Sequence, residues 1–323
     1  RILGLSTDPD DLGAAKTSYI MNEKITPKYI DPMVDFGFKK IFKESGKQQL
    51  IIRPLNAIFG LDITDIDIRE SEQLGLSEQE RRATYDMFCT SRSGESFIIE
   101  VQLSAQAYFA ERAIFYSART VSRKAQQGEW DYNFAPVFFL GFLNFDFPHL
   151  PGETPQKDQF IYRFSLREDE THEQMSRALR FAFLEVARFD KPKEECVSFE
   201  DRFLFMMKNL PTFAEQPELW DDPYFEEMMK EAEFANMTFE EQEAYIASMK
   251  VKWDNKNTID YAHAKGKEEG RAEGRAEGKA EGRAEGKIEE RRETALRMLA
   301  DQLPVEAVAK YTGLPVEQVK ALL

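Results

Sequence analysis

The stretch YDMFCTSRSGESFIIEVQL (Tyr85–Leu103) decides the fold of this 323-residue chain, because it holds two apolar strands and the turn that joins them. A three-residue loop, Arg92–Gly94, with Gly in the left-handed position that such loops favour, predicts an antiparallel hairpin. In the resulting register Asp86 is the cross-strand neighbour of Glu100. Like charges repel at that spacing, so this pair is unexpected unless a cation lies between the two carboxylates.

Strand alternation places Glu100 and Gln102 on one face of the sheet, together with Asp86. Oxygen ligands of this kind suit Mg²⁺ or Mn²⁺, which keep several waters and accept a phosphate oxygen. A solvated or salt-bridged strand face would explain an isolated Glu-x-Gln equally simply. The strand is otherwise so apolar that both faces are expected to be covered, where an unpaired carboxylate is costly. Both interpretations stay open on the residues of the hairpin alone.

The segments around the hairpin predict a mixed α/β fold. In chain order we expect two helices within 35–59, strands at 64–70, 82–90 and 96–103, a long helix at 107–126 and a strand over 135–147. An antiparallel hairpin followed by a helical crossover to a further strand gives a mixed sheet flanked by helices. Residues 160–168 and 179–189 are predicted to add strands at an edge.

Composition fits a protein with a substantial core. Hydrophobic residues make up 42% of the chain and 26 are Phe, which excludes global disorder. The net charge of −15 argues against coating nucleic acid by bulk electrostatics, although it leaves room for a local basic groove. No run approaches the roughly 18 apolar residues of a membrane helix. Cys89 and Cys196 lack CxxC or metal-type spacing, so we expect a reducing, cytoplasmic location and no membrane partner.

Composition shifts predict five segments along the chain. They are an irregular lead-in at 1–30, an α/β core at 31–199 with extra edge strands, a helical subdomain at 200–265, a low-complexity repeat at 266–290 and a small helical unit at 291–323. Aromatic and Met stripes in the helical subdomain are typical of core packing rather than of a cofactor site.

The repeat is Gly-rich, with Gly at every fourth position from 266 to 286. The spacing of its acidic and basic residues gives no favourable Glu-to-Lys pairs four residues apart. Each Gly also costs about 1 kcal/mol of helix stability relative to Ala. We therefore expect a solvated spacer or a marginal helix. A Gly-striped helix that associates with a second copy is the alternative.

After the repeat, apolar spacing predicts three short helices with turns at Pro304 and at 312–315. This spacing is similar to that of helix-turn-helix modules in DNA-binding regulators. The last helix has only Glu317, Gln318 and Lys320 as polar side chains that could contact DNA bases, and it is not basic. A protein-docking or oligomerisation unit is thus an equally good interpretation.

Several motifs together resemble one known family. They are DFGFKKIF (Asp35–Phe42), the hairpin from Asp86 to Gln102, ERAIFYSARTVSRKAQQGEWDY (Glu111–Tyr132), APVFFLGFLNF, NTIDYAHAKGKEEG and the Glu-Gly-Arg repeats. In this combination the chain, from about Asp31 to the end of the Gly tract, resembles the recombination-promoting nuclease (Rpn) group of PD-(D/E)XK nuclease family transposases.

The resemblance implies a PD-(D/E)XK, restriction endonuclease-like core and a divalent metal, Mg²⁺ or else Mn²⁺. By position Asp86 matches the first carboxylate of the motif and Glu100 the second, both as metal ligands, and the carbonyl of Val101 is a common further ligand. Gln102 stands where many members of the superfamily have the catalytic Lys. A neutral amide can orient a water and donate to phosphate but supplies no positive charge.

Other residues are candidates to complete the site. Lys39 or Lys40 could supply the missing charge if the first helix ends near the metal, and Lys40 is also a candidate contact to DNA. A solvated helix face explains both lysines too. Asp35 belongs to the family's DxxFK pattern, as an additional acid or as a helix cap. On the long helix Arg112, Tyr116 and Arg119 could line a DNA groove, or pack against the sheet.

The sequence therefore predicts a divalent-metal-dependent DNA endonuclease linked to DNA recombination, mobile elements or defence. DNA is the expected partner, and a homo-oligomer could form through the repeat or the C-terminal helices. The alternative function is a catalytically weak or inactive scaffold that binds DNA or protein through its C-terminal region. Strand transfer, the reaction of a transposase, has no independent support in the residues.

Overall fold

The computed structural model describes residues 27–44, 46–69, 72–73, 83–124, 131–147 and 156–323. Most of the expected lead-in at 1–30 lies outside these residues. The chain divides into two compact units, 1–255 and 256–323. No helix in the described part is long and apolar enough to cross a membrane.

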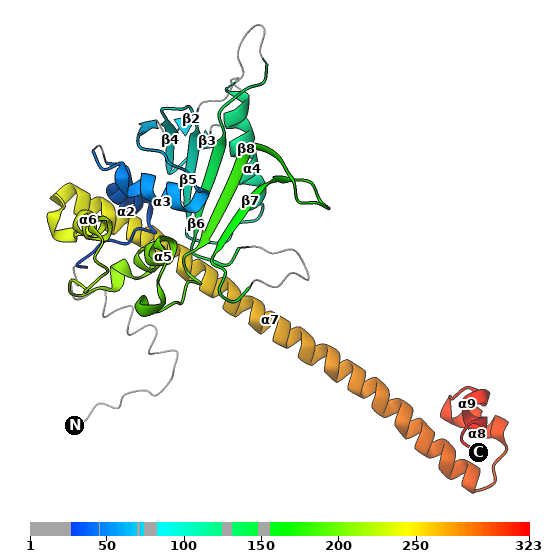
Figure 1. Ribbon diagram of the computed structural model, residues 1–323. Coiled ribbons are helices and arrows are strands. Elements are labelled where there is room, and N and C mark those ends of the chain that lie inside the picture. The colour runs from blue at the N-terminus through cyan, green and yellow to red at the C-terminus, as the bar shows by residue number, and fades with distance from the viewer. Residues whose placement is uncertain (1–26, 45, 70–71, 74–82, 125–130, 148–155) are drawn as a thin grey trace, which may run out of the picture. The chain divides into compact units, whose positions relative to one another are not determined.

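The first unit is built on a six-stranded mixed sheet (Figure 1). Its strands, in spatial order, are β1 (Ile66–Arg69), β4 (Met87–Ser91), β5 (Ser96–Gln102), β6 (Val137–Leu143), β8 (Gln174–Glu185) and β7 (Ile161–Arg167). Strands β5, β6 and β8 are parallel, whereas β1, β4 and β7 pair antiparallel with their neighbours. A separate two-stranded sheet contains β2 (Glu72–Gln73) and β3 (Ala83–Thr84). The mixed sheet with flanking helices confirms the expected α/β class.

One strand lies elsewhere than expected. We predicted 179–189 as an edge strand, but β8 lies inside the sheet between β6 and β7. The residues of β8 that pair with β6 face the core on both sides: Ala182 and Leu184 belong to one apolar cluster and Phe183 to the other. Only β7 is the edge strand that the sequence predicted, and its outer half is exposed.

The hairpin of β4 and β5 has the predicted turn. The N–H of Ser91 donates to the carbonyl of Glu95 at 3.0 Å, and Gly94 has a φ of +92°, a left-handed conformation that favours glycine. Regular pairing ends with Met87 opposite Ile99. One further step in that register places Asp86 opposite Glu100, as the sequence predicted.

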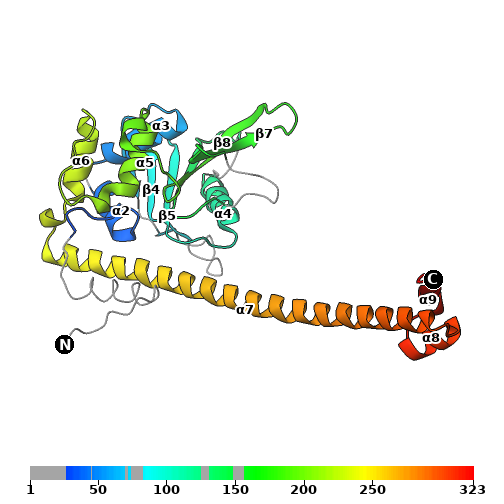
Figure 2. The same cartoon turned by 90° about the horizontal axis from the view of Figure 1, so that it is seen from below.

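Helices cover both faces of the sheet (Figures 1 and 2). One face packs against the helices α2 (Asp35–Phe42), α3 (Gln49–Phe59), α5 (Phe199–Asn209) and α6 (Pro223–Ala232). The other face is covered by α4 (Phe109–Ser122). Short 3₁₀ turns lie at η1 (Lys193–Glu195), η2 (Leu210–Thr212) and η3 (Phe234–Asn236). Helices α5 and α6 thus share one core with the sheet.

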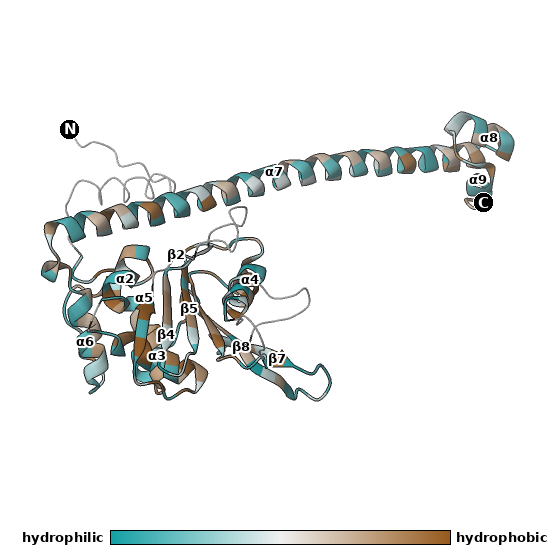
Figure 3. Cartoon of the chain, turned by 90° about the horizontal axis from the view of Figure 1, so that it is seen from above, coloured by the Kyte–Doolittle hydropathy of each residue, from teal (hydrophilic) through white to brown (hydrophobic). Residues whose placement is uncertain are grey.

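A single helix, α7 (Phe239–Ala300), extends through the Gly-rich repeat. It begins with a capping box, in which the N–H of Glu241 donates to Oγ1 of Thr238 and the N–H of Thr238 donates to a carboxylate oxygen of Glu241. Hydrophilic residues alternate with less polar ones along the repeat (Figure 3), and no atom outside the helix's own backbone lies within 4 Å of the Cβ that any of its six glycines would carry. The structure therefore has a helix where an irregular spacer was one expectation.

The second unit has a small core of its own at the end of α7. The helices α8 (Val305–Thr312) and α9 (Val316–Lys320) follow, separated by Gly313 at a φ of +69°. Ala295, Val308, Leu314 and Val319 are buried together in a cluster. Two of the three predicted short helices and both predicted turns are therefore present, whereas the first predicted short helix is the end of α7.

Candidate active site

Asp86, Glu100 and Gln102 form a polar cluster at the carboxyl end of β5, the strand that begins the parallel part of the sheet. Asp86 directly precedes β4, and its Oδ2 accepts a 2.6 Å hydrogen bond from the backbone N–H of Val101. This bond fixes the Asp86 carboxylate against β5 at the level of Glu100. The side chain of Val101 points into the opposite face with Ile99, which leaves Glu100 and Gln102 on the face with Ile98.

Glu100 is a buried carboxylate with an unsatisfied oxygen. The residue is 5% exposed, and its Oε1 has no hydrogen-bond partner. Its Oε2 accepts a 3.1 Å bond from Nε2 of Gln102. A buried polar atom without a partner costs about 1–3 kcal/mol, and more when the group is charged. Such an atom in an otherwise well-packed strand indicates a place where a ligand completes the bonding.

The wall beside Glu100 is apolar. Glu100 pairs across the sheet with Gly141 of β6, and Gly141 pairs with Phe183 of β8. A Cβ on Gly141 would approach Cδ1 of Phe183 to 2.8 Å, so only glycine leaves room for that ring. The packed aromatic wall lowers the local dielectric around Glu100.

Burial and like charge shift both carboxyl groups in the same direction. The pKa of Glu100 is raised to about 8, first by burial and then by the negative charge of Asp86, which outweigh the charge of Arg112 and the hydrogen bonds from Gln102 and from the backbone of Asp86. The pKa of Asp86 is raised as well, first by burial and also by the charge of Asp35, against the hydrogen bond from Val101. At neutral pH one proton is therefore retained by the pair when no cation is near.

Helix α2 brings charged groups to this cluster. Asp35 and Lys39 form an ion pair at 2.7 Å, and both are within electrostatic range of Asp86. One turn further along, Lys43 also interacts with the charge of Asp86, and its pKa is lowered first by burial and then by Lys39. The sequence predicted Asp35 and Lys39 as candidates but missed Lys43. Its spacing of eight residues from Asp35 and four from Lys39 is the helical signal that identifies it.

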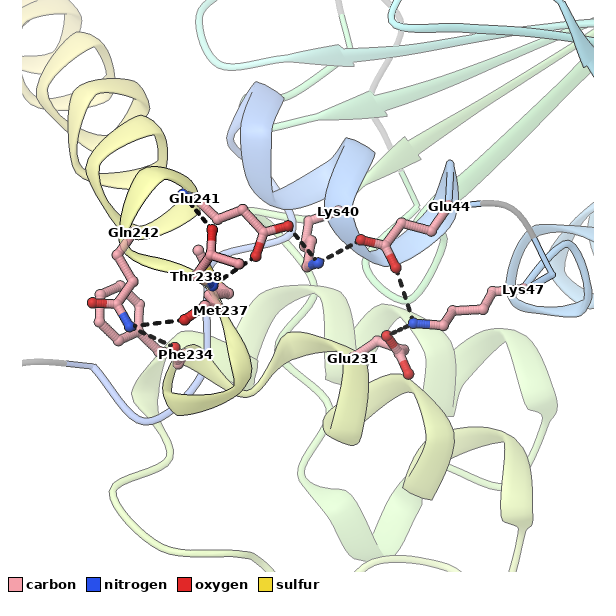
Figure 4. A network of polar contacts seen from close by, with 9 residues as sticks. All are labelled: Lys40, Glu44, Lys47, Glu231, Phe234, Met237, Thr238, Glu241 and Gln242. Atoms are coloured by element: carbon pink, nitrogen blue, oxygen red, sulfur yellow. Dashed lines mark hydrogen bonds and ion pairs between the residues drawn. The ribbon is translucent and has the colours of Figure 1, made fainter.

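Lys40 belongs to a different network of polar contacts (Figure 4). Its ammonium group forms ion pairs with Glu44 and, at 2.8 Å, with Glu241 of α7. Glu44 also pairs with Lys47, which in turn contacts Glu231 of α6. Contact of Lys40 with DNA stays a prediction that these carboxylates do not favour, because they already neutralise the charge.

The first turns of α7 hold the start of α2 in place. The N–H of Asp31 donates to the hydroxyl of Tyr245 at 2.9 Å, and the carboxylate of Asp31 pairs with Lys252. The N–H of Phe36 donates to Oγ of Ser248 at 3.3 Å. Together with the Lys40–Glu241 ion pair, these bonds fix the orientation in which α2 presents Asp35 and Lys39.

Helix α4, which covers the other face of the sheet from α2, contributes the guanidinium group of Arg112 and the phenol of Tyr116. Arg112 lowers the pKa of both Asp86 and Glu100, and its Nη2 is buried without a hydrogen-bond partner. Its Nη1 donates to Gln106, and its guanidinium lies 5.3 Å from the ring centre of Phe109. The pKa of Tyr116 is raised, first by burial and then by the charge of Glu100.

The remaining residue predicted to contact DNA, Arg119, lies in the core. It is 7% exposed and faces the sheet near Tyr85, so this burial does not fit the predicted position in a DNA groove. In contrast, Tyr108 at the start of α4 is 78% exposed and has a φ of +61°. A left-handed non-glycine residue is strained, and such strain is often found at functional sites.

The donor set suits a metal that binds few protein ligands. No group of three or more His, Cys, Asp or Glu side chains that could hold an ion occurs in the described part of the chain. Mg²⁺ commonly takes one or two carboxylates and completes its shell with water and phosphate oxygens. Asp86 and the unsatisfied Oε1 of Glu100 fit this pattern. Ligation by the Val101 carbonyl stays a prediction.

Comparison with known proteins agrees with this geometry. Residues 32–262 match the sequence profile of the PD-(D/E)XK nuclease family transposases. The chain belongs to this family. No curated protein and no solved structure matches the chain significantly. The match to the PD-(D/E)XK family includes the whole sheet and ends inside α7, before the Gly-rich repeat.

Membership of the PD-(D/E)XK family makes a nuclease or transposase role the general class of function. The family usually hydrolyses phosphodiester bonds and normally uses divalent metals, with DNA as the implied substrate. In this PD-(D/E)XK chain the roles of individual residues rest on the arrangement around Asp86 and Glu100.

Proposed function

We propose that this protein is a divalent-metal-dependent endonuclease that hydrolyses phosphodiester bonds in DNA. One observation carries the proposal: Glu100 keeps an unsatisfied carboxylate oxygen buried beside Asp86, at the end of a central strand of a PD-(D/E)XK sheet. Such an oxygen is costly in a protein that never binds a cation, and it is useful in one that does.

Asp86 and Glu100 would hold the metal, Mg²⁺ or Mn²⁺. When bound, the ion neutralises charge on the scissile phosphate and lowers the pKa of the attacking water. The chain keeps both carboxylates in position: the Val101 N–H holds Asp86, and the Gln102 amide holds Oε2 of Glu100 and leaves Oε1 available. Gln102 is thus a positioning residue in place of a catalytic Lys.

The positive charge that Gln102 lacks is supplied by neighbouring elements. Lys39 of α2 and Arg112 of α4 interact with the carboxylate pair from two different helices, and both charges act on Asp86. A phosphate bound at the pair would meet a cation from each helix, which stabilises the extra negative charge of the transition state. The carboxylate of Asp35, paired with Lys39, orients that ammonium group.

DNA contact is proposed for the rim formed by the start of α4. Tyr108 is exposed there, and Arg112, one turn further along α4, has a buried donor without a hydrogen-bond partner. Guanidinium groups contact backbone phosphate, and exposed aromatic rings stack on bases. We further propose that cleavage serves DNA recombination or a mobile element, in keeping with the transposase description of the family.

A plasmid-cleavage assay tests the proposal. The full chain is incubated with supercoiled plasmid and Mg²⁺ or Mn²⁺, beside the variants D86N and E100Q. The matched control is E111Q, because Glu111 is an exposed carboxylate on α4. Both site variants should lose at least about 100-fold in rate, because a missing metal ligand removes charge stabilisation of several kcal/mol.

Calorimetric titration with Mn²⁺ separates the nuclease from a non-catalytic scaffold. The nuclease requires Mn²⁺ binding that is lost in E100Q and retained in E111Q. Cleavage by D86N and E100Q at the wild-type rate would reject the assignment of the active site. Absence of both cleavage and Glu100-dependent binding would favour the scaffold.

A further inference from the structure

A polar cavity lies at the amino ends of the parallel strands β5 and β6, opposite to the end that carries Glu100. Its volume is about 580 Å³, and its lining includes Glu95 and Pro136, which directly precede β5 and β6. Glu100 and Gln102 lie at the opposite, carboxyl end of β5. We name this cavity the arginine pocket, after the four arginines of β7 and β8 that line it: Arg163, Arg167, Arg177 and Arg180.

Two of these arginines have a structural role. Nε of Arg163 donates to the carbonyl of Ile58 at 2.7 Å, and Nη1 of Arg180 donates to the carbonyl of Phe59 at 2.8 Å. These carbonyls belong to the last turn of α3, where the helix dipole is negative. Capping of α3 therefore accounts for Arg163 and Arg180 but not for the other two arginines.

Neither Arg167 nor Arg177 donates to a carbonyl of α3. Arg167 donates to Oγ of Ser165 and to the carbonyl of His172, both uncharged acceptors. Among the described residues, neither Arg167 nor Arg177 forms an ion pair with a carboxylate. A β-bulge between residues 165 and 167 shifts the pairing of β7 with β8 at this point. Bulges commonly redirect side chains toward a functional site.

The pocket concentrates positive charge in a protein whose net charge is −15. The one acidic side chain in its described lining is that of Glu95, which accepts hydrogen bonds from Ser91 and Ser93. The pKa of Arg180 is lowered, first by burial and then by the other three arginines of the pocket. Arg163 also pairs with Glu200 at 3.6 Å. The guanidinium groups of the other three arginines repel one another, and an anion in the cavity removes that cost.

We propose that the arginine pocket binds a small phosphate-bearing ligand of nucleotide size. Arginine forks match phosphate oxygens in geometry and charge, and the cavity volume falls within the range of small-molecule sites. Apolar lining from Leu61, Pro136 and Phe164 offers a surface for a base beside the phosphates. The pocket and the carboxylate pair lie at opposite ends of β5, so this site is separate from the nuclease centre and does not depend on it.

Calorimetry on the metal-free full chain at low salt tests the proposal with three probes: pyrophosphate, ATP and adenosine. Pyrophosphate and ATP should bind, whereas adenosine should not. The double variant R167Q/R177Q should weaken ATP binding at least about tenfold, since each charged hydrogen bond lost is worth that factor or more. Its melting temperature without ligand should stay close to the wild-type value, because the two hydrogen bonds of Arg167 are exposed and lie within the β7–β8 hairpin.

The matched control is R69Q, because Arg69 is an exposed arginine on β1 at the other edge of the sheet, paired with Asp67 at 2.8 Å. It should bind ATP as the wild type does. Failure of both ATP and pyrophosphate to bind would overturn the proposal, and so would equal ATP affinity in R167Q/R177Q. Adenosine binding as tight as that of ATP would overturn it too. A duplex oligonucleotide that alone bound through these arginines would replace the small ligand with a DNA surface.

Discussion

The backbone N–H of Val101 donates a 2.6 Å hydrogen bond to Oδ2 of Asp86, at the point where regular pairing of β4 and β5 ends. The bond holds the first carboxylate against the strand that carries the second one. It opposes the effect of burial on the pKa of Asp86 without cancelling it. Two neighbouring carboxyl groups are therefore kept in place at a cost in stability that a cation can remove.

That cost predicts a pH-dependent difference in stability between the wild type and E100Q. The pKa of Glu100 is raised from 4.5 to about 8 in the folded protein, so unfolding releases a proton between these two values. In the absence of metal, wild-type stability should fall relative to E100Q as pH rises from 4.5 to 8, and the difference should then level off. We expect E100Q to be more stable by at least about 1 kcal/mol at pH 8.

Urea denaturation at pH 5, 6.5 and 8 measures this difference, with E111Q as the control because its carboxylate is exposed. A constant difference between E100Q and the wild type over this range would contradict the shifted pKa. Mn²⁺ should stabilise the wild type but not E100Q, since only a folded state that binds the ion gains from it.

Gln102 should act by positioning Glu100. In Q102A the 3.1 Å bond to Oε2 is lost and the Glu100 side chain gains rotational freedom. We expect Mn²⁺ affinity and cleavage rate to fall together by about tenfold, the value of one hydrogen bond to a charged group. Kinetics and titration calorimetry on Q102A measure both quantities. A fall in rate at unchanged Mn²⁺ affinity would instead assign Gln102 to the substrate or the attacking water.

Lys39 and Lys40 are adjacent in sequence and should differ in effect. Lys39 acts on Asp86, whereas Lys40 joins α2 to α7 through Glu241. K39Q should lower the cleavage rate at least about tenfold with little loss of stability. K40Q should lower the melting temperature, because it leaves Glu44 and Glu241 without their shared cation, and should affect the rate less. The reverse pattern would exchange their roles.

The sequence predicted the hairpin and the position of Asp86 opposite Glu100 because these signals are local. A three-residue loop ending in Gly94 fixes the register, and that register alone places Asp86 opposite Glu100. Family resemblance added the roles that the residues alone left open. Both the turn and the alternation of β5 are encoded within a single short stretch of the chain.

Other features depend on contacts between distant segments and could not be predicted in this way. Arg112 and Arg119 occupy similar positions on one amphipathic helix, yet only Arg119 is buried against the sheet. The partner of Lys40 lies 201 residues away on α7. The arginine pocket requires the bulge in β7, which leaves no mark in the sequence pattern.

In the Gly-rich part of α7, local helix stability should depend on the helix propensity of the residues at the glycine positions. Nothing lies within 4 Å of a Cβ placed on Gly274 or Gly278, so each Ala has space and should add about 1 kcal/mol to local helix stability. The variant G274A/G278A should therefore show higher helicity at elevated temperature by circular dichroism, with an unchanged mass by sedimentation velocity. If the glycines instead pack against a second copy of the helix, the added methyl groups would separate the two backbones. A drop in mass relative to the wild type would then establish self-association through the repeat, because only a close helix–helix contact is sensitive to so small a group.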